Sequence, residues 1–287
     1  MSIKPTAKAV LALLWAAGIC LASTCAGNSE TQLQEETQTD PVDVVLARLN
    51  KKTSELKSYE GQVEYTYIQP LLESKALRKG VLYYSRSGGQ SALRINFNTL
   101  KQEDEKEQKF IEQYIVADGA VLSRGDHQFK GIWLVQIDYQ VEQVTYHQLA
   151  EATDPNKPAD VFDLVSRNFP MLGFTKIEEL KKQFEVTLVE QKQPGPEDFI
   201  QVHLKVKPNS VYKDDYISID FWIDKELGLP VKMIAVKTEP EPPFGDIDEI
   251  KFLKPKVNKG IDKKVFEFTV PSSFGRPEII PKKKDTR

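Results

Sequence analysis

The sequence is poor in cysteine: its 287 residues include only two, Cys20 and Cys25, and none follows residue 25. Two cysteines so close together in an apolar leader are neither a disulfide framework nor a metal site. The sequence also lacks an excess of charge of either sign, because 39 Lys and Arg residues face 42 Asp and Glu residues. This balance is not that of a strongly basic nucleic-acid-binding protein, so we expect no nucleic-acid partner.

Long apolar runs are missing too. The longest, residues 9–21, is shorter than the ~20 residues that a membrane-spanning helix needs. Lysines precede this run and small residues follow it, which is the layout of a secretory signal. We therefore expect residues 1–26 to be a signal peptide, cleaved after Ala26, and the mature protein to be exported. The alternative is a lipid anchor at Cys25, although Thr24 stands where such acylation sites have Gly, Ala or Ser.

The mature chain is expected to begin with a linker and a helix. Residues 27–39 are rich in Gln, Glu and Thr and predict a disordered, solvated linker. Asp40 can then cap a helix whose first turn accommodates Pro41. The helix is expected to run to about residue 57, because apolar residues follow at helical spacing, namely Val42, Val45, Leu46, Leu49 and Leu56.

From Tyr59 onward the apolar period changes to two. Apolar and polar residues alternate in several short runs separated by turn signals, with the apolar positions at Val63, Tyr65, Tyr67, Leu93, Ile95, Phe97, Ile200, Val202, Leu204, Ile217, Ile219, Phe221 and Ile223. This pattern indicates antiparallel strands with one apolar face and one solvated face. No alternation of strands with helices is present, so the fold class is mainly β (α+β), with a single curved antiparallel sheet of about ten strands.

Two stretches interrupt the strand pattern. Residues 101–109 are almost all charged or amide-bearing and predict a solvated hairpin loop. Residues 141–174 predict two short helices, from apolar residues at helical spacing, namely Val141, Val144 and Leu149, then Val161, Leu164 and Val165. With the first helix, these would cover the apolar face of the sheet. A last strand is expected from Val265 to Val270.

The sequence carries no recognisable catalytic or metal-binding motif. His127, His147 and His203 are far apart and lack ligand spacing, so we expect no metal and no cofactor. The mature chain has no serine nucleophile elbow, phosphate-binding glycine loop or cysteine nucleophile. We expect it not to be an enzyme. An Asp- or Glu-dependent hydrolase remains an alternative, because the separation of carboxylates such as Asp220 and Asp224 cannot be read from a sequence.

The apolar face of the sheet is the candidate binding site. Few helices are available to bury it, so the face either forms a filled core or lines a partly open apolar cavity. The residues that we expect to line such a cavity are Val63, Tyr65, Tyr67, Leu82, Tyr84, Leu93, Ile95, Phe97, Ile217, Ile219, Phe221 and Ile223.

Several motifs, taken in order, resemble those of the outer-membrane lipoprotein carrier family (LolA-like). They are Gly80-Val-Leu-Tyr-Tyr-Ser-Arg-Ser, Leu93-Arg-Ile-Asn-Phe, Tyr114-Ile-Val-Ala-Asp-Gly-Ala-Val-Leu and Val265-Phe-Glu-Phe-Thr-Val-Pro-Ser-Ser-Phe. The resemblance covers most of residues 40–275, which we expect to form one carrier-like domain, followed by a flexible basic tail, residues 276–287. The sequence departs from the family at Ser87, where a proline is usual, in the length of the 101–109 loop, and in an enlarged segment, residues 176–215.

The resemblance implies a half-barrel of about ten or eleven antiparallel strands with a lid of about three helices over the concave face. It implies a periplasmic, monomeric carrier that shelters acyl chains of lipoproteins, or of a related lipid, between an inner-membrane releasing transporter and an outer-membrane acceptor. Arg86 falls at the position of the family arginine that holds the lid closed; otherwise it is a solvated arginine at a hairpin end. A lipid- or peptide-sensing module on the same half-barrel fold is the alternative function.

Overall fold

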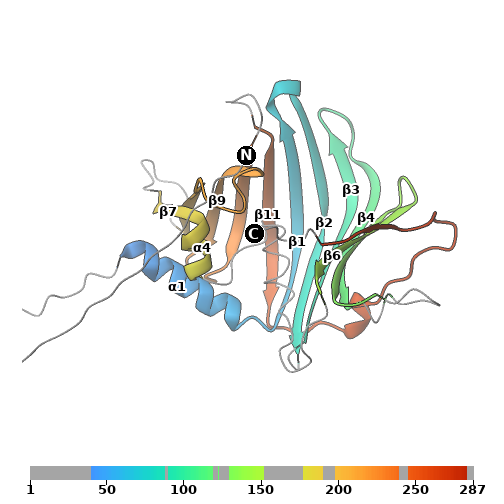
Figure 1. Ribbon diagram of the computed structural model, residues 1–287, viewed down its shortest axis with the longest axis horizontal. Coiled ribbons are helices and arrows are strands. Elements are labelled where there is room, and N and C mark those ends of the chain that lie inside the picture. The colour runs from blue at the N-terminus through green and yellow to red at the C-terminus, as the bar shows by residue number, and fades with distance from the viewer. Residues whose placement is uncertain are drawn as a thin grey trace, which may run out of the picture. The chain divides into compact units, whose positions relative to one another are not determined.

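One twelve-stranded sheet dominates the fold. The computed structural model describes residues 40–87, 90–118, 122, 129–151, 177–189, 198–238 and 245–282, all within the unit Thr39–Arg287. The strand order is β12-β6-β5-β4-β3-β2-β1-β11-β10-β9-β8-β7, and the sheet is open and curved (Figure 1). Only β12 and β6 run parallel to each other; the other neighbours are antiparallel.

The strands are long in the middle of the sheet and short at its edges. Their bounds are β1 Ser58–Gln69, β2 Ser74–Ser87, β3 Gln90–Gln102, β4 Gln108–Asp118, β5 Ile132–Asp138, β6 Gln143–Ala150, β7 Phe184–Leu188, β8 Phe199–Val206, β9 Tyr216–Asp224, β10 Pro230–Lys237, β11 Ile247–Val257 and β12 Glu278–Ile280. The twelve strands of the described residues exceed the expected ten or eleven. The loop expected at residues 101–109 is shorter in the structure: residues 103–107 join β3 to β4, and the residues on either side belong to these strands.

Two α-helices lie in the described part of the chain, α1 (Pro41–Ser54) and α4 (Ile177–Gln183). The start of α1 is as predicted: Asp40 Oδ1 accepts a hydrogen bond from the Val42 backbone N–H at 3.0 Å, and Pro41 occupies the first turn. Figure 1 shows both helices at the β7–β9 end of the sheet. None of the helices in the described ranges is long and apolar enough to cross a membrane.

The prediction of a helix that starts at Val141 is wrong. Residues 143–150 form strand β6, which pairs with β5 along its length. Val144 and Tyr146 are buried on one face, but the register shifts between Ile132 and Trp133 of β5. Leu149 has the opposite strand parity to Val144 and Tyr146 and is buried on the other face of the sheet. The apolar residues that fit a helical spacing therefore do not share one face. The second predicted helix, with Val161, Leu164 and Val165, lies outside the described residues.

The strand predicted from Val265 to Val270 is also wrong. A short 3₁₀ helix, η3 (Lys263–Phe266), stands there and is followed by irregular chain. Arg94 Nη1 donates hydrogen bonds to the Val265 and Glu267 carbonyls, at 2.8 and 2.6 Å. These carbonyls therefore accept from an arginine side chain and not from the backbone N–H groups of a neighbouring strand. The region expected as a tail contains strand β12.

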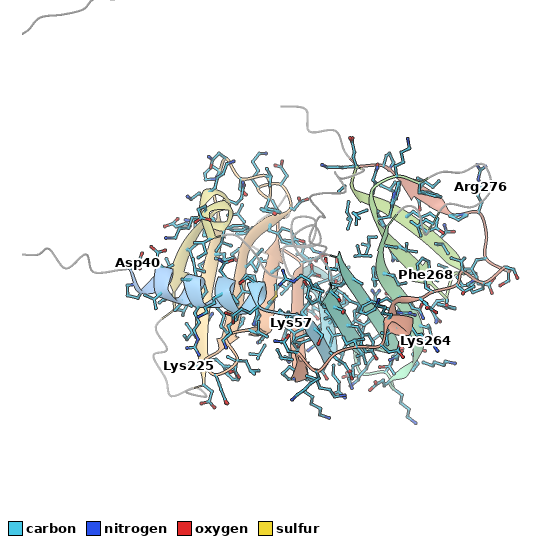
Figure 2. All side chains as sticks on the ribbon, turned by 90° about the horizontal axis from the view of Figure 1, so that it is seen from below. Asp40, Lys57, Lys225, Lys264, Phe268 and Arg276 are labelled. Atoms are coloured by element: carbon cyan, nitrogen blue, oxygen red, sulfur yellow. The ribbon has the colours of Figure 1, made fainter. Side chains whose placement is uncertain are left out.

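Buried residues form three clusters on the two faces of the sheet. The first, which we call the pocket cluster, lies over β1–β5 and includes Leu82, Tyr84 and Leu93. The second, the helix cluster, joins α1 and α4 to β7–β10. The third lies on the other face of β4–β6 and is covered by the C-terminal segment through Phe268, Val270 and Phe274, a segment that Figure 2 shows running beside these strands. Helices thus cover one part of the inner face, and the part over β1–β5 is where a cavity can form.

Candidate ligand-binding pocket

A pocket of about 270 Å³ lies against the inner face of the sheet. Its lining comes from eight strands, β1 to β5 and β9 to β11, and strand alternation places the contributing side chains on one face. The apolar lining consists of Val63, Leu82, Leu93, Ile95, Phe97, Leu134 and Ile250. Ligand pockets are typically concave and mostly apolar with a few polar groups, and this pocket has that composition.

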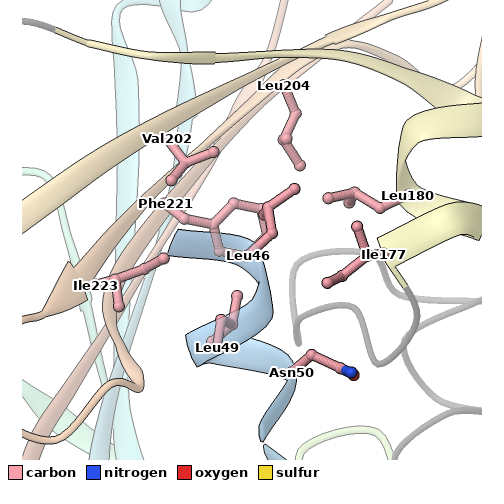
Figure 3. Close-up of a pocket in the computed structure, with 9 residues that line it drawn as sticks. All are labelled: Leu46, Leu49, Asn50, Ile177, Leu180, Val202, Leu204, Phe221 and Ile223. Atoms are coloured by element: carbon pink, nitrogen blue, oxygen red, sulfur yellow. The ribbon is translucent and has the colours of Figure 1, made fainter. Parts of the chain in front are cut away.

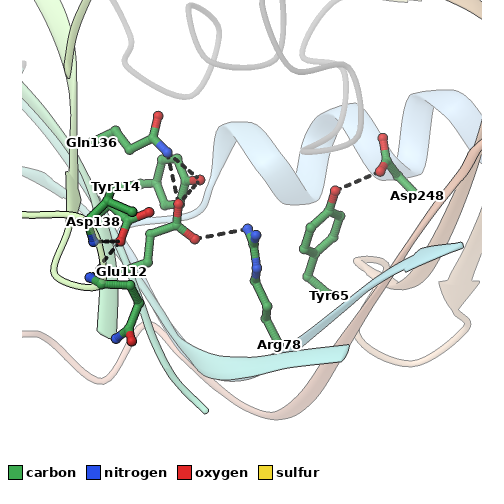
Figure 4. A network of polar contacts seen from close by, with 9 residues as sticks. Tyr65, Arg78, Glu112, Tyr114, Gln136, Asp138 and Asp248 are labelled. Atoms are coloured by element: carbon green, nitrogen blue, oxygen red, sulfur yellow. Dashed lines mark hydrogen bonds and ion pairs between the residues drawn. The ribbon is translucent and has the colours of Figure 1, made fainter. Parts of the chain in front are cut away.

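One polar group at the pocket is built around a buried carboxylate. Arg78 Nη1 donates to Glu112 Oε2 at 2.9 Å, and the Glu112 side chain is only 3% exposed. Its other oxygen, Oε1, accepts from the Tyr114 hydroxyl and from Gln136 Nε2, each at 2.8 Å (Figure 4). Both oxygens of Glu112 therefore accept hydrogen bonds. Of the charged side chains in this group, Arg78 lines the pocket.

A second polar group repeats this arrangement on β1, β10 and β11. Asp248 Oδ1 accepts from the Tyr65 hydroxyl at 2.7 Å, and Oδ2 lies 3.1 Å from Lys237 Nζ. The Asp248 side chain is 1% exposed and that of Lys237 is 33% exposed. Again the carboxylate is turned inward and satisfied, while its cation reaches solvent.

The tyrosines of the pocket remain protonated over a wide pH range. Burial, together with the neighbouring Asp248, raises the pKa of Tyr65 far above its usual value, and burial with Glu112 does the same to the pKa of Tyr114. Burial raises the pKa of Tyr216 to about 12. These hydroxyls consequently act as neutral hydrogen-bond groups in the pocket.

A second, much smaller cavity of about 20 Å³ lies between α1, α4 and strands β8 and β9. Leu46, Ile177, Leu180 and Phe221 are among its lining residues and point toward one another in Figure 3. A space of this size holds about one water molecule and no ligand. This part of the inner face is a filled core.

The predicted cavity residues lie in different parts of the structure. Six line the large pocket, namely Val63, Tyr65, Leu82, Leu93, Ile95 and Phe97, and Tyr84 is buried in the pocket cluster. Ile219, Phe221 and Ile223 belong to the helix cluster instead, because α1 and α4 pack on them. Ile217 is 44% exposed at the start of β9, and the Tyr67 hydroxyl hydrogen-bonds Asp246.

Sequence reasoning missed most of the polar lining. Arg78, Tyr114, Tyr216, Lys237 and Asp248 line the pocket but were not predicted. A signal existed for two of them: Arg78 has the strand parity of Leu82 on β2, and Asp248 that of Ile250 on β11. The alternation rule treats charged residues as solvated, so it passed over inward-pointing charges that have buried partners.

Arg86 does contact the first helix. Its guanidinium Nη2 donates to the carbonyls of Thr53, Ser54 and Leu56, at 3.1, 2.6 and 3.0 Å. The solvated-arginine alternative does not describe this side chain. The arginine binds the C-terminal end of α1, where unpaired carbonyls and the helix dipole favour a cation.

Across the described ranges, no group of three or more His, Cys, Asp or Glu residues is arranged to hold a metal ion. His203 Nδ1 lies 3.1 Å from Asp220 Oδ1, and Asp224 Oδ1 accepts from backbone N–H groups of its own turn. His127 lies outside the described residues.

Comparison with known proteins finds likeness in structure alone. No protein-family model and no curated protein matches the chain. Similar solved structures include the Pseudomonas aeruginosa MucA/MucB complex, at 12% identity and TM-score 0.40, over 80% of this chain and 62% of that chain. A DUF1329 family protein from Desulfovibrio piger matches at 11% identity and TM-score 0.41, over 80% of this chain and 98% of that chain.

A LolA superfamily protein from Nitrosomonas europaea matches at 10% identity and TM-score 0.32, over 79% of this chain and 97% of that chain. LolA superfamily proteins are thus among the solved structures that this chain resembles, the family that the motifs indicated. The chain spans 62% of the length of the MucB chain in the complex.

Proposed function

We propose that this protein is a non-enzymatic, periplasmic carrier that shelters the acyl chains of a lipoprotein, or of a related lipid, in the pocket lined by β1–β5 and β9–β11. The observation that carries the proposal is the pocket itself, whose walls are mostly apolar and whose polar groups are few. The order of the motifs along the sequence and the predicted export signal support it. An inner-membrane releasing transporter and an outer-membrane acceptor would load and unload a monomeric protein.

The energetics suit a carrier. Each methylene removed from water contributes about 0.8 kcal/mol, so roughly ten sheltered methylenes supply on the order of 8 kcal/mol before the costs of association. Such binding is strong enough to keep an acyl chain from aggregating and weak enough to be reversed by a membrane, which offers the same apolar environment. No covalent step is needed, and the protein would use no cofactor.

The first test is native mass spectrometry of protein purified from an envelope fraction without detergent. We expect a population heavier by an acylated lipoprotein or a phospholipid, and renewed uptake when delipidated protein meets added lipid. A clean mass with no uptake would overturn the carrier proposal. A stable crosslink to a membrane-embedded regulator, with lipid bound but never transferred, would favour the sensing module instead.

A matched pair of variants ties uptake to the pocket. Ile95 lines the pocket and is partly buried, so Ile95→Trp should fill it and reduce lipid uptake. Ile234 is partly exposed on β10 and belongs to none of the three buried clusters, so Ile234→Trp adds the same bulk elsewhere. Equal uptake by both variants, each folded by circular dichroism, would place the lipid outside this pocket.

A further inference from the structure

Two of the residues that line the pocket carry a positive charge. Arg78 and Lys237 both line the pocket, and their side chains are 31% and 33% exposed. The carboxylates that they contact, Glu112 and Asp248, are 3% and 1% exposed. A ligand that enters therefore meets the two cations as the more exposed charges. Glu112 is not part of the lining, and Asp248 lines the pocket with both carboxylate oxygens already paired.

Both cations contact an aromatic side chain of strand β1. They stand on β2 and β10, three strand spacings or roughly 14 Å apart in the sheet order. The guanidinium of Arg78 lies 5.9 Å from the centre of the Tyr65 ring on β1 and 5.1 Å from the centre of the Phe110 ring on β4. Lys237 Nζ lies 4.8 Å from the centre of the Tyr67 ring, which is also on β1. Each cation therefore contacts an aromatic side chain of β1, the strand next to β2 and two strands from β10.

The two cations have more hydrogen-bond donors than the two carboxylates use. All four oxygens of Glu112 and Asp248 are engaged with described partners. A guanidinium has five N–H donors, and the described contacts of Arg78 with hydrogen-bond acceptors involve Nη1 alone, toward Glu112. An ammonium has three donors, and Lys237 directs one toward Asp248. Arg78 and Lys237 therefore have N–H donors beyond those that contact the two carboxylates. An anionic group that accepts hydrogen bonds would complement these donors.

We propose that Arg78 and Lys237 form a subsite for the anionic headgroup, a phosphate ester or a carboxylate, of an amphiphile whose acyl chain lies in the apolar part of the pocket. This inference rests on the proposed function and narrows its ligand class. The headgroup would be held by charge-assisted hydrogen bonds, and the chain by Leu82, Ile95 and the apolar residues around them. The carboxylates fix the two cations in place, so the subsite is formed before the ligand arrives.

The test compares two amphiphiles with one chain length, dodecyl phosphate and the uncharged dodecylglycerol, by calorimetry with delipidated protein below their micelle concentrations. We expect dodecyl phosphate to bind roughly tenfold more tightly, as charge-assisted hydrogen bonds are the stronger class. Inorganic phosphate should show no binding at the same concentrations, which separates a lipid headgroup from a free anion. Equal affinity of the two amphiphiles, or binding of inorganic phosphate as tight as that of dodecyl phosphate, would overturn the subsite.

The variants are chosen so that no buried carboxylate is left without its cation. Arg78→Gln alone would leave Glu112 buried without its cation, so the test uses the double variant Arg78→Gln/Glu112→Gln. We expect the preference for dodecyl phosphate to fall to roughly threefold or less, since one of the two cations remains, with the affinity for dodecylglycerol unchanged. Lys79→Gln is the matched control, because Lys79 pairs with Glu107 outside the pocket. An undiminished preference in the double variant would remove Arg78 from the subsite.

Octyl and dodecyl chains separate the two proposals. Affinity that rises with chain length but ignores the headgroup would leave the carrier standing and overturn the anionic subsite. Absence of binding by any of these amphiphiles would overturn both.

Discussion

The guanidinium of Arg86 closes the C-terminal end of α1, with its Nη2 2.6 Å from the Ser54 carbonyl oxygen. The Arg86 backbone N–H also donates to the Lys57 carbonyl at 2.7 Å. This one residue therefore joins the end of β2 to both the helix and the start of β1. The contact couples the position of the helix to the hairpin that lines the pocket.

We predict that Arg86→Met loosens the last turn of α1. The variant loses charge-assisted hydrogen bonds worth about 1.5–3 kcal/mol in typical cases, namely those that the guanidinium donates to the carbonyls of Thr53, Ser54 and Leu56. Hydrogen–deuterium exchange of α1 should accelerate severalfold or more. Lys51→Met, an exposed substitution in the same turn, is the control. Equal exchange in both variants would contradict a role for Arg86 in holding the helix.

The pair of Arg78 and Glu112 gives a second prediction, measured on stability. Arg78→Gln should lower the free energy of unfolding by about 3 kcal/mol, because it leaves a nearly inaccessible carboxylate without its cation. The double variant with Glu112→Gln should be more stable than Arg78→Gln alone. Urea denaturation of the single and double variants measures this coupling. Strictly additive losses would show that the two side chains do not depend on each other.

The buried tyrosines predict a loss of stability in alkali. Burial raises the pKa of Tyr59 from 10.0 to about 12, and that of Tyr216 also to about 12. The folded value is the higher one, so the contribution is fully present below pH 10, the unfolded pKa, and is lost as the pH rises toward 12. The loss is roughly 2–3 kcal/mol for each tyrosine.

Urea midpoints measured from neutral pH to pH 12 check this prediction, with tyrosinate absorbance followed in parallel. Tyr59→Phe should leave the neutral-pH stability nearly unchanged and reduce the alkaline loss, since phenylalanine has no proton to release. An alkaline loss as steep in Tyr59→Phe as in the unchanged protein would exclude Tyr59 as a source.

The helix cluster supplies a fourth prediction. Leu46 of α1 is 3% exposed and packs on the β7–β10 part of the sheet, whereas Val44 of the same helix is 56% exposed. Leu46→Ala should cost about 2–5 kcal/mol of unfolding free energy, and Val44→Ala should change it by no more than about 0.5 kcal/mol. Similar unfolding midpoints for both would mean that α1 is not anchored through Leu46.

The sequence predicted the local elements better than their long-range arrangement. Strand alternation identified the wall of the pocket at Leu82 and Ile95, because a period of two depends only on neighbours along the chain. It could not show that α1 lies on Phe221 and fills that part of the inner face, since this depends on a contact between residues far apart in sequence. Likewise Arg78 and Glu112 meet across two hairpins, which no local pattern encodes.

Gly80, the first residue of the Gly80-Val-Leu motif, gives the last prediction. A Cβ atom at this position would lie 2.0 Å from the Asn96 carbonyl oxygen of β3, next to the register shift between Lys79 and Gly80. Only glycine allows so close an approach of two backbones. Gly80→Ala must therefore push β2 and β3 apart, and it should lower the free energy of unfolding by about 2–4 kcal/mol.

Gly275 is the matched control, because a Cβ atom there would meet nothing within 4 Å. Gly275→Ala should change the unfolding free energy by no more than about 0.5 kcal/mol. The pocket lies on the same two strands, so Gly80→Ala should also weaken binding of dodecylglycerol, whose chain touches Leu82 and Ile95 in the proposed complex. A Gly80→Ala protein as stable as Gly275→Ala would mean that β2 and β3 are not so closely apposed at Asn96.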